Sequence, residues 1–565
     1  MRPRTRILFA AGLLAVAAAL AAPPPPAARP QDVPIPDLST EDGLRRVLDD
    51  LEQRWEQAAR RVGAAVAGRL AGKAQDDHRA ELEAWESLAA AYDDPRLEAV
   101  LSRWLHRRTV TRDPALTRRV HLWAVTRRAA QVELDPQVRR RTLELSERLG
   151  RFPYTLDGRE ASREELERIL RTSADRARRK RAWLALAEAG RQLQQDVKAL
   201  VRLRAVKARG TITEYFHHLV YEANDIDQTV VYSSGERAAG RTRQMQESLL
   251  SRLRETLGVE ALDPWDLDHA IEVRSRRRLA GTGVPELDGA ERSAATARTV
   301  LRAIGFQQEP EAVLVPLLPA PGIGLPVEIP GRHATLLRPP PTARTVLFEA
   351  GRALQTASTR AEAPLLKGYP WIPGARNAVY DEAMGEVMAA WLHDPLVLRE
   401  ALGMTPAQAE AYLEDLKERE LLAWRRRLLD QGFEFTMYVN PDADLDERWR
   451  LLYFKSIGLK LDPSLPLPWP ATWAYIEAPG TSINGLLAPA VAQEVHALLR
   501  EKLGDGRVRE GRAAAYLIEA CFSGGESLPL GERLARSTTQ GYEMGRYLEW
   551  LGAPSPAPRS AGPPR

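Results

Sequence analysis

Residues 345–355 read TVLFEAGRALQ, an apolar helical segment that carries one glutamate and one arginine. Positions 348 and 352 lie one turn apart on the same face of a helix, with Glu349 between them. With histidine at both positions the segment would match H-E-x-x-H, in which two imidazoles bind zinc and the glutamate is general base to the metal-bound water. This chain has Phe348 and Arg352 instead. Neither side chain is a zinc ligand, so the pattern predicts a degenerate metal site.

A second helix with acidic residues is predicted over 379–391, VYDEAMGEVMAAW, which ends before Pro395. It places Glu382 and Glu386 one turn apart, where like charges repel each other. Together with Glu349, three carboxylates would face one cavity suited to a divalent cation. Buried without a counter-charge, such carboxylates take up protons or draw in water.

Arg352 is a source of positive charge for this cavity. A guanidinium is a permanent cation, and its planar fork suits a carboxylate. We therefore expect Arg352 to form an ion pair with Glu382, Glu349 or both, and Phe348 to fill the space of an imidazole and its metal. The alternative is that Arg352 points to solvent. In the first interpretation, the two residues keep the fold intact without zinc.

The two segments resemble the paired active-site helices of the helical zinc oligopeptidases. This group includes oligopeptidase F, thimet oligopeptidase and the angiotensin-converting-enzyme-like peptidyl dipeptidases. Four further segments resemble the same proteins in the same order, at 208–227, 262–270, 478–499 and 522–538. The resemblance implies a large, mostly α-helical body with a deep cleft and one small β-sheet before the active-site helix. It also implies that Glu349 is the remnant of the general base and that Glu382 matches the third zinc ligand.

The sequence departs from this family at the positions that serve its chemistry. Phe348 and Arg352 replace the two zinc histidines, and Gln355 replaces a histidine often found next on that helix. In the late segment, relatives carry tyrosines that stabilise the tetrahedral intermediate and grip the peptide. This chain has TSING at 481–485, and Tyr475 is the only tyrosine between 454 and 515. The residues expected to line the cleft are Gln355, Glu386, Tyr475, Thr481, Ser482 and Gly485.

The remaining residues do not restore a zinc site. Catalytic zinc needs three protein ligands and a water, and two glutamates alone do not select zinc. None of the nine histidines is on the 348/352 face, and the adjacent His217 and His218 point to different sides of a helix. We therefore predict no metal ligands, no bound zinc and no other cofactor.

The composition predicts a mostly α protein, because the good helix formers Ala, Leu, Arg and Glu dominate. From 40 to 210 apolar residues recur at helical steps, as in Leu44, Val47, Leu48 and Leu51. Strand patterns are found only at 312–319, 324–330 and 333–339, directly before Thr342, a predicted helix N-cap. The predicted organisation is a signal peptide (1–21), a Pro/Ala-rich linker (22–38), an N-terminal helical region (39–207), a metallopeptidase-like region (208–551) and a disordered tail (552–565).

The N-terminus predicts export. Arg2, Arg4 and Arg6 precede an apolar run over 7–22 with an Ala-Leu-Ala site at 19–21, which favours a secretory signal over a retained anchor. The Arg- and Ala-rich composition suggests a bacterium, so we expect a periplasmic or secreted protein. The single Cys521 cannot form an intramolecular disulfide.

The charge balance gives no reason to expect a nucleic-acid partner. Removing 1–21 takes three arginines from a net charge of +4, which leaves about +1. We expect no nucleic-acid binding and no membrane contact beyond the signal segment. The basic run Arg176–Arg181 is predicted to be a solvated helix face.

The function expected from these observations is that of an exported, catalytically inactive homologue of a zinc oligopeptidase. Its cleft would bind a peptide or a protein, and an active relative is one candidate partner. The alternative is a working peptide hydrolase with an atypical metal site, or an acid–base enzyme that uses Glu349 with Glu382 or Glu386.

Overall fold

The computed structural model describes residues 38–72, 78–105, 111–211, 215–289, 291–307, 311–316 and 318–552. In these residues the protein is mostly α-helical, as predicted, with two small β-sheets. The predicted signal peptide, almost all of the predicted linker and the predicted tail beyond Gly552 lie outside the described residues.

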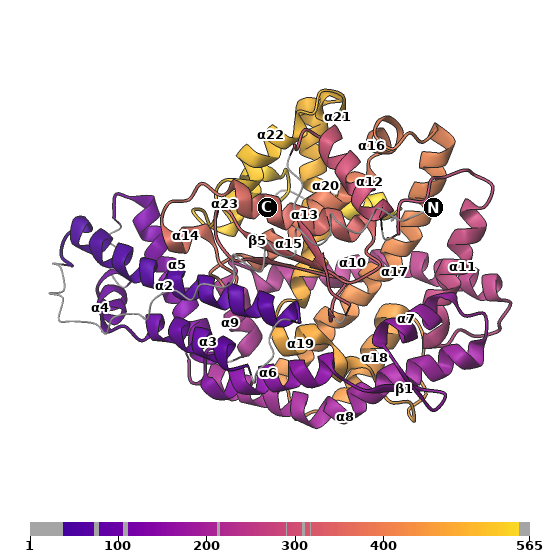
Figure 1. The fold of residues 1–565 in the computed structure, drawn as a ribbon, viewed down its shortest axis with the longest axis horizontal. Helices are drawn as coiled ribbons and strands as arrows, with labels where there is room; N and C mark the ends of the chain where they lie inside the picture. The colour runs from indigo at the N-terminus through magenta and orange to yellow at the C-terminus, as the bar shows by residue number, and fades with distance from the viewer. Residues whose placement is uncertain are drawn as a thin grey trace, which may run out of the picture.

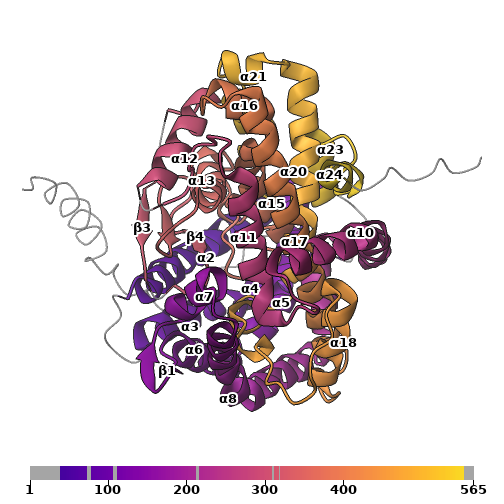
Figure 2. The ribbon, with the colours of Figure 1, turned by 90° about the vertical axis from the view of Figure 1, so that its right-hand side faces the viewer.

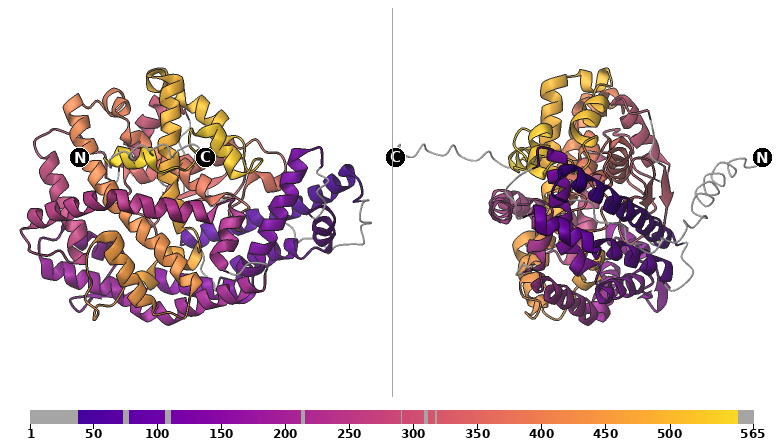
Figure 3. Two further views of the ribbon diagram at one scale, coloured as in Figure 1. Left: turned by 180° about the vertical axis from the view of Figure 1, so that it is seen from behind. Right: turned by 90° about the vertical axis from the view of Figure 1, so that its left-hand side faces the viewer.

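The first helices form one end of the molecule and its lower edge, in indigo to purple in Figure 1. Figure 3 shows the same helices from behind, where the indigo end again extends from the body. The helices that precede the three-stranded sheet in the sequence are α2 (Glu41–Leu70), α3 (Arg79–Tyr92), α4 (Pro95–Trp104), α5 (Pro114–Glu133), α6 (Pro136–Gly150), α7 (Arg163–Thr172), α8 (Arg176–Arg209), α9 (Phe216–Ala223), α10 (Gln228–Leu257), η1 (Pro264–Asp266), α11 (Leu267–Leu279) and α12 (Arg292–Ala303).

The helices after the sheet make up the middle and the opposite side of the molecule. Figure 2 shows α15 and α17 inside it, with β3 and β4 on one flank and α10 on the other. These helices are α13 (Ala343–Ser358), α14 (Pro364–Lys367), α15 (Ala378–Ala389), η2 (Ala390–His393), α16 (Pro395–Glu400), α17 (Pro406–Val439), α18 (Leu445–Ile457), η3 (Trp469–Ala471), α19 (Trp473–Glu477), α20 (Ser482–Leu503), α21 (Gly506–Arg509), α22 (Ala513–Leu517), η4 (Ile518–Phe522), α23 (Leu530–Ser537) and α24 (Gly545–Leu551).

Several helices begin at an Asp-Pro pair in the sequence. The aspartate side chain accepts a hydrogen bond from a main-chain N–H of the first turn, and proline occupies the first helical position, where no N–H is needed. Four helices begin in this way, with N-caps Asp94, Asp113, Asp135 and Asp394. The local sequence therefore accounts for the start of each of these helices, and each of the four aspartates also forms an ion pair with a side chain distant in sequence.

The predicted apolar stripe of α2 is confirmed. Leu44, Val47, Leu48 and Leu51 are all buried, together with Trp55 one turn further on. The indole Nε1 of Trp55 donates to the hydroxyl of Tyr92 on α3 at 2.9 Å, which connects the first two helices of the core.

One hairpin was not predicted. Strands β1 (Tyr154–Leu156) and β2 (Arg159–Ala161) pair antiparallel around Asp157 and Gly158, both of which have positive φ. An Asp-Gly pair between short strands is a strong hairpin signal, so the sequence contained the information. The prediction that strands are confined to one region was therefore wrong.

The predicted sheet before the active-site helix is present. It consists of β3 (Ala312–Leu314), β4 (Gly322–Pro326) and β5 (His333–Leu337) in the order β3-β5-β4. β5 is parallel to β3 and antiparallel to β4, so that β4 forms one edge of the sheet. The chain leaves β5 and enters α13, which packs against β4 and β5.

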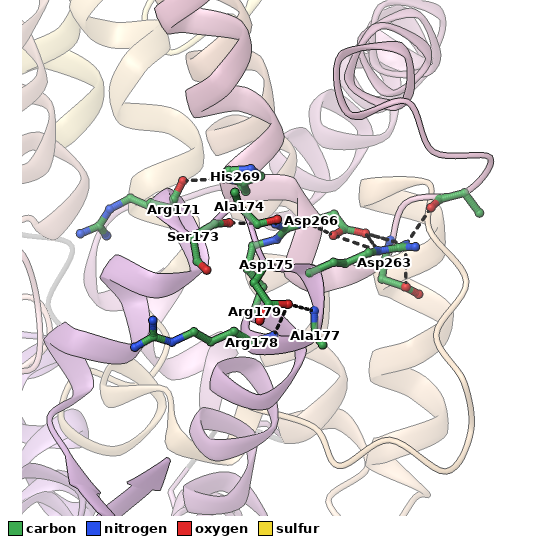
Figure 4. Close-up of polar contacts among 12 residues, drawn as sticks. Arg171, Ser173, Ala174, Asp175, Ala177, Arg178, Arg179, Asp263, Asp266 and His269 are labelled. Atoms are coloured by element: carbon green, nitrogen blue, oxygen red, sulfur yellow. Dashed lines mark hydrogen bonds and ion pairs between the residues drawn. The ribbon is translucent and has the colours of Figure 1, made fainter. Parts of the chain in front are cut away.

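The basic run at the start of α8 is exposed at Arg176, Lys180 and Arg181, as predicted, but Arg179 departs from the prediction because it is buried. The Arg179 side chain is only 3% exposed, and its Nη2 donates to Asp266 Oδ1 at 2.7 Å. Figure 4 shows Asp266 at the centre of these contacts, with Asp263 beside it. Arg176 reaches both carboxylates at 2.8 Å. These contacts attach α8 to the segment that leads into α11.

Asp266→Asn is expected to destabilise the protein by about 3 kcal/mol at neutral pH, because it leaves the buried Arg179 without its counter-charge. Burial opposes ionisation of Asp266, but hydrogen bonds from Arg176 and Arg179 hold its pKa below the usual 3.8. The stabilisation is therefore complete above pH 3.8 and is lost as the pH falls through the lower folded pKa. Urea unfolding of both proteins over a pH series measures the difference.

Asp263→Asn is the matched control. It removes the partially exposed carboxylate that Arg176 also contacts, and its expected cost is below about 1 kcal/mol. Equal costs for the two variants would show that Asp266 is not the centre of the contact.

No helix among the described residues is long and apolar enough to span a membrane.

Candidate functional site

The site is built on the crossing of α13 and α15, which glycines allow to be very close. The N-cap of α13 is Thr342, as predicted, and its hydroxyl accepts from Thr345 N at 3.1 Å. A Cβ on Gly351 would clash with the main-chain oxygen of Met384. A Cβ on Gly385 would lie 2.7 Å from the Phe348 ring. Both helices therefore need glycine where they touch.

Arg352 forms ion pairs inside this crossing. Its Nε and Nη2 each lie 2.8 Å from Asp381 Oδ2, and its Nη1 donates to Glu349 Oε2 at 3.4 Å. A second guanidinium, from Arg376, lies 2.5 Å from the other oxygen of Asp381. The pairing with Glu349 agrees with the prediction, and so does the inward direction of Arg352.

The main carboxylate partner of Arg352 was not predicted. Arg352 contacts Asp381, whereas the adjacent Glu382 has no hydrogen bond or ion pair in the part of the chain that the structure describes. Consecutive residues of a helix point about 100° apart, so an error of one residue changes which acid faces α13. Of the two partners that the prediction allowed, Arg352 therefore pairs with Glu349 and not with Glu382, and Asp381 is an additional partner.

The pKa of Asp381 is lowered and that of Glu349 is raised, because burial and the nearby arginines act against each other to different extents at the two carboxyls. Burial opposes the ionisation of Asp381, but Arg352 and Arg376 hold its pKa below the usual value. Burial raises the pKa of Glu349 to about 7, although Arg352 lowers it in part. Glu349 is 2% exposed, which is why burial has so large an effect on its pKa.

The Glu349 carboxyl packs directly on strand β4. A Cβ on Gly322 would lie 2.9 Å from Glu349 Cγ, and a Cβ on Gly324 would overlap Glu349 Oε2. The same Cβ on Gly324 would lie 2.6 Å from His333 Nε2, so both polar atoms border one small space. The two glycines therefore make room for the glutamate.

His333 also borders this space and was not among the predicted site residues. The Thr356 hydroxyl lies 3.0 Å from Arg352 O and 3.2 Å from His333 Nδ1. Nε2 is buried with no hydrogen-bond partner among the described residues. Burial lowers the pKa of His333 to about 3, so the ring is neutral. The available signal was its position at the start of the strand that leads into α13.

A cavity of about 560 Å³ opens beside this crossing. Residues from α2, α3, α9, β4, α13, α15, α17 and the 472–485 segment line it. Phe348 is half-buried and forms part of the wall, so its ring does not fill the space completely. Of the predicted site residues, the cavity brings together Phe348, Glu349, Arg352, Glu382, Tyr475, Thr481, Ser482 and Gly485.

Two residues predicted to line the cleft do not lie in the cavity wall. Gln355 is buried, and its Oε1 accepts from Arg376 Nη2 at 2.9 Å. Glu386 is buried between Arg344 and Arg427, at 2.7 and 3.0 Å. Both arginines approach Glu386 from outside its own helix, so the helical repeat alone could not reveal its direction.

The late segment, 472–485, is held by two carboxyls of α17 that were not among the predicted site residues. The Tyr475 hydroxyl donates to Asp430 Oδ1 at 3.2 Å. Glu434 accepts from the main-chain N–H groups of Gly480 and Ser482 at 2.7 and 3.0 Å, and from the Ser482 hydroxyl. Burial raises the pKa of Asp430 to about 6 and that of Glu434 to about 7. Glu434 thus satisfies N–H groups at the start of α20.

The donor set does not fit a zinc ion. A guanidinium stands at the second histidine position and already pairs with Asp381 and Glu349. Among the described residues, no group of three or more His, Cys, Asp or Glu side chains is arranged to hold a metal ion. His217 is buried beside His218 and Phe435, with ring centroids 4.3 and 4.6 Å away. That the protein binds no zinc stays a prediction.

The fold is similar to that of solved peptidase structures. No protein-family model and no curated protein matches the sequence. A solved structure assigned as an oligoendopeptidase F superposes with a TM-score of 0.65 at 15% identity, over 91% of this chain and 92% of that one. The structure of PZ peptidase A with an inhibitor superposes with a TM-score of 0.59 at 16% identity, over 89% of this chain and 95% of that one. A structure from Bacillus anthracis that is also assigned as an oligoendopeptidase F superposes with a TM-score of 0.58 at 15% identity, over 89% of this chain and 94% of that one.

These similarities define the class of fold. The chain has the large, mostly α-helical fold of the oligoendopeptidase F and PZ peptidase structures over nearly its whole described length. The predicted resemblance to the helical oligopeptidases is confirmed at the level of the fold. At 15–16% identity, the likeness extends to the fold alone.

Proposed function

We propose that the protein binds peptides in the cavity beside Arg352 and does not hydrolyse them by a zinc mechanism. The observation that carries this proposal is the pairing of Arg352 with Asp381 and Glu349. The guanidinium supplies the positive charge that a metal ion would otherwise bring. The relatives' general base is therefore represented here by a carboxyl that is buried, ion-paired and packed on β4.

The shape and lining of the cavity support peptide binding. Its volume of about 560 Å³ is in the range of small-ligand sites. The edge strand β4 lines it, and an edge strand can take an extended peptide by main-chain pairing. Trp85, Trp371 and Trp473 line the wall, and the rings of the first two meet edge to face at 6.2 Å. Such a surface suits apolar side chains.

In this proposal the protein is a peptide- or protein-binding scaffold, and an active relative is one candidate partner. The competing proposal is a hydrolase that works through Glu349, whose pKa of about 7 suits acid–base catalysis. A metal-dependent peptidase would need ligands that the site does not provide. The 2% exposure of Glu349 and its ion pair with Arg352 favour the binding function.

We expect no turnover when the purified protein is incubated with a panel of fluorogenic peptides and added zinc. The reason is that no metal-bound water is available for Glu349 to activate. Calorimetric titration with the same peptides is expected to show binding. Turnover that a chelator abolishes and that Glu349→Gln removes would instead establish a metallopeptidase. Chelator-insensitive turnover lost in Glu349→Gln would establish the acid–base alternative.

Export is a second part of the proposal. It is supported by the basic and apolar residues of the first 22 positions and by the Ala-Leu-Ala site at 19–21. Expression in a bacterial host, followed by fractionation and N-terminal sequencing, tests it. A cytoplasmic product that keeps its first residues would overturn it.

A further inference from the structure

Three arginines outside the cavity converge on one carboxylate. Glu418 lies on α17, Arg252 on α10, and Arg274 and Arg278 on α11. These three helices pack against one another (Figure 2). We call the four residues the arginine cluster. None of them lines the proposed peptide cavity, so the cluster is a separate feature of the described structure.

All three guanidinium groups contact the same oxygen of Glu418. This Oε1 lies 3.1 Å from the Nη2 of Arg252, 3.1 Å from that of Arg274 and 2.9 Å from that of Arg278. The other oxygen, Oε2, accepts from Arg274 Nε at 2.6 Å. Donors that share one acceptor lie at most about 6 Å apart, so the three Nη2 atoms form a compact triangle around Oε1.

One carboxylate neutralises only one of these three cations. Burial opposes the ionisation of Glu418, but hydrogen bonds from Arg274 and Arg278 hold its pKa below the usual 4.5, so it is charged at neutral pH. A guanidinium is always charged. Two uncompensated positive charges therefore remain within contact distance of one atom. Such like charges repel each other unless an anion joins them.

The acids around the arginine cluster do not supply the missing negative charges. The neighbouring acids of α11 and α17 pair with arginines of their own, in the pairs Asp415–Arg419, Glu272–Arg419 and Glu272–Arg276. Glu255 has no ion pair among the described residues, and neither has Arg277, whose Nη1 donates to the main chain one residue after Glu255. Glu255 and Arg277 offset each other, so the excess charge stays positive.

The cluster has unused hydrogen-bond donors around the same point. Each Nη2 carries two hydrogens, and Glu418 is the one acceptor that the described residues offer to the three Nη2 atoms. Arg278 Nη1 is buried and has no hydrogen-bond partner among them. The side chains of Arg252, Arg274 and Arg278 are 37, 24 and 19% exposed, so an ion can approach them from solvent. The far side of the triangle from Oε1 is thus a place for a second acceptor.

We propose that the arginine cluster binds a doubly charged oxyanion, specifically a phosphate group. A dianion matches the two uncompensated charges, and its oxygens accept from several guanidinium groups at once. The group could belong to free phosphate or to a phosphate monoester, which share this chemistry. The proposal does not depend on peptide binding in the cavity.

Calorimetric titration of the full chain with sodium phosphate tests the proposal at about pH 8, where phosphate carries two charges. Ionic strength is held constant with sodium chloride, because salt screens exposed charges. We expect one phosphate to bind per chain, and acetate, a monoanion, to bind at least about tenfold more weakly. Absence of phosphate binding overturns the proposal, and so does acetate binding as tight as that of phosphate.

Glycerol 3-phosphate identifies the source of the phosphate group. If it binds as tightly as phosphate, the site is open to monoesters. If it binds about tenfold more weakly or not at all, the site takes the free ion. Both results support a phosphate site, provided that free phosphate binds.

Variants locate the site. Arg252→Gln and Arg278→Gln each remove one of the three cations and are expected to weaken phosphate binding about tenfold. Arg276→Gln is the matched control, because Arg276 is an exposed arginine of α11 that pairs with Glu272 instead of Glu418. Its affinity should change by less than about threefold. Equal losses in the control and in the two cluster variants would indicate a general effect of surface charge and overturn the assignment.

Glu418→Gln separates a binding site from a purely structural contact. The carboxylate repels an incoming anion, so its removal is expected to tighten phosphate binding about tenfold. Without phosphate the variant should unfold at a lower temperature, because the arginines lose their shared counter-charge, and phosphate should restore part of this loss. A variant that is destabilised and gains nothing from phosphate would show that the cluster is structural and overturn the proposal. The arginine variants, which keep the other two contacts to Glu418, decide the question if this variant does not fold.

Discussion

Arg352→Ala is expected to destabilise the protein by about 3–5 kcal/mol, the cost of removing one partner of a buried ion pair. The change leaves Asp381 with Arg376 alone and leaves Glu349 with no cation. Glu349 would then remain protonated to higher pH, because Arg352 is what lowers its pKa toward about 7. Urea unfolding followed by circular dichroism at neutral pH measures the loss.

Lysine at the same position is expected to restore only part of the stability, because it keeps the charge but not the fork that contacts Asp381. Arg360→Ala is the control, since Arg360 forms an exposed ion pair with Glu519 and its loss should cost less than about 1 kcal/mol. An Arg352→Ala protein as stable as this control would show that Arg352 does not hold the site together.

A double-mutant cycle identifies the partner of Arg352. Arg352→Ala combined with Asp381→Ala should cost less than the sum of the single changes, by about 1–3 kcal/mol, because each removes the other's unpaired charge. The cycle with Glu382→Ala should show a smaller coupling, because Glu382 makes no direct ion pair. The reverse order would mean that Glu382, and not Asp381, faces Arg352 in solution.

The variant with Phe348→His and Arg352→His is expected to unfold at a temperature that depends on zinc. Two imidazoles one turn apart and the free carboxylate of Glu382 in the same cavity would give three ligands. Zinc at 100 times its dissociation constant would add about 2.7 kcal/mol of stability. Without zinc the variant should be less stable than the parent protein, because Asp381 loses one of its cations. The parent protein should show no zinc-dependent shift.

The variant with Phe348→Ala and Arg352→Ala is the matched control, because it lacks the same two side chains but has no imidazoles. Zinc should not stabilise it. A double-histidine variant that responds no more than this control would show that Glu382 cannot complete the site. Peptide hydrolysis should stay very low even with zinc, because the only tyrosine of the late segment donates its hydroxyl to Asp430.

The sequence by itself determined the helices, several of their limits and the absence of histidine from positions 348 and 352. Asp-Pro pairs and Thr342 fix helix starts through hydrogen bonds within one turn, so no distant residue is needed. The identities of Phe348 and Arg352 are read directly at the two positions of the motif. The sequence also contains Gly351 and Gly385, but it does not show which residue each of these glycines contacts.

Only the tertiary structure decided which acid faces which base. The helical repeat gives the face of a residue to within about one position, and Asp381 and Glu382 differ by that one position. Glu386 was predicted to line the cleft because it lies one turn from Glu382. Its burial could not be foreseen, because Arg344 and Arg427, which pair with it, lie about 40 residues away on either side in the sequence. His333 and Asp430 reached the site in the same way, through packing of strands and helices distant in sequence. Burial and ion pairing depend on such long-range neighbours, because the electric field at a side chain comes from all the elements packed around it.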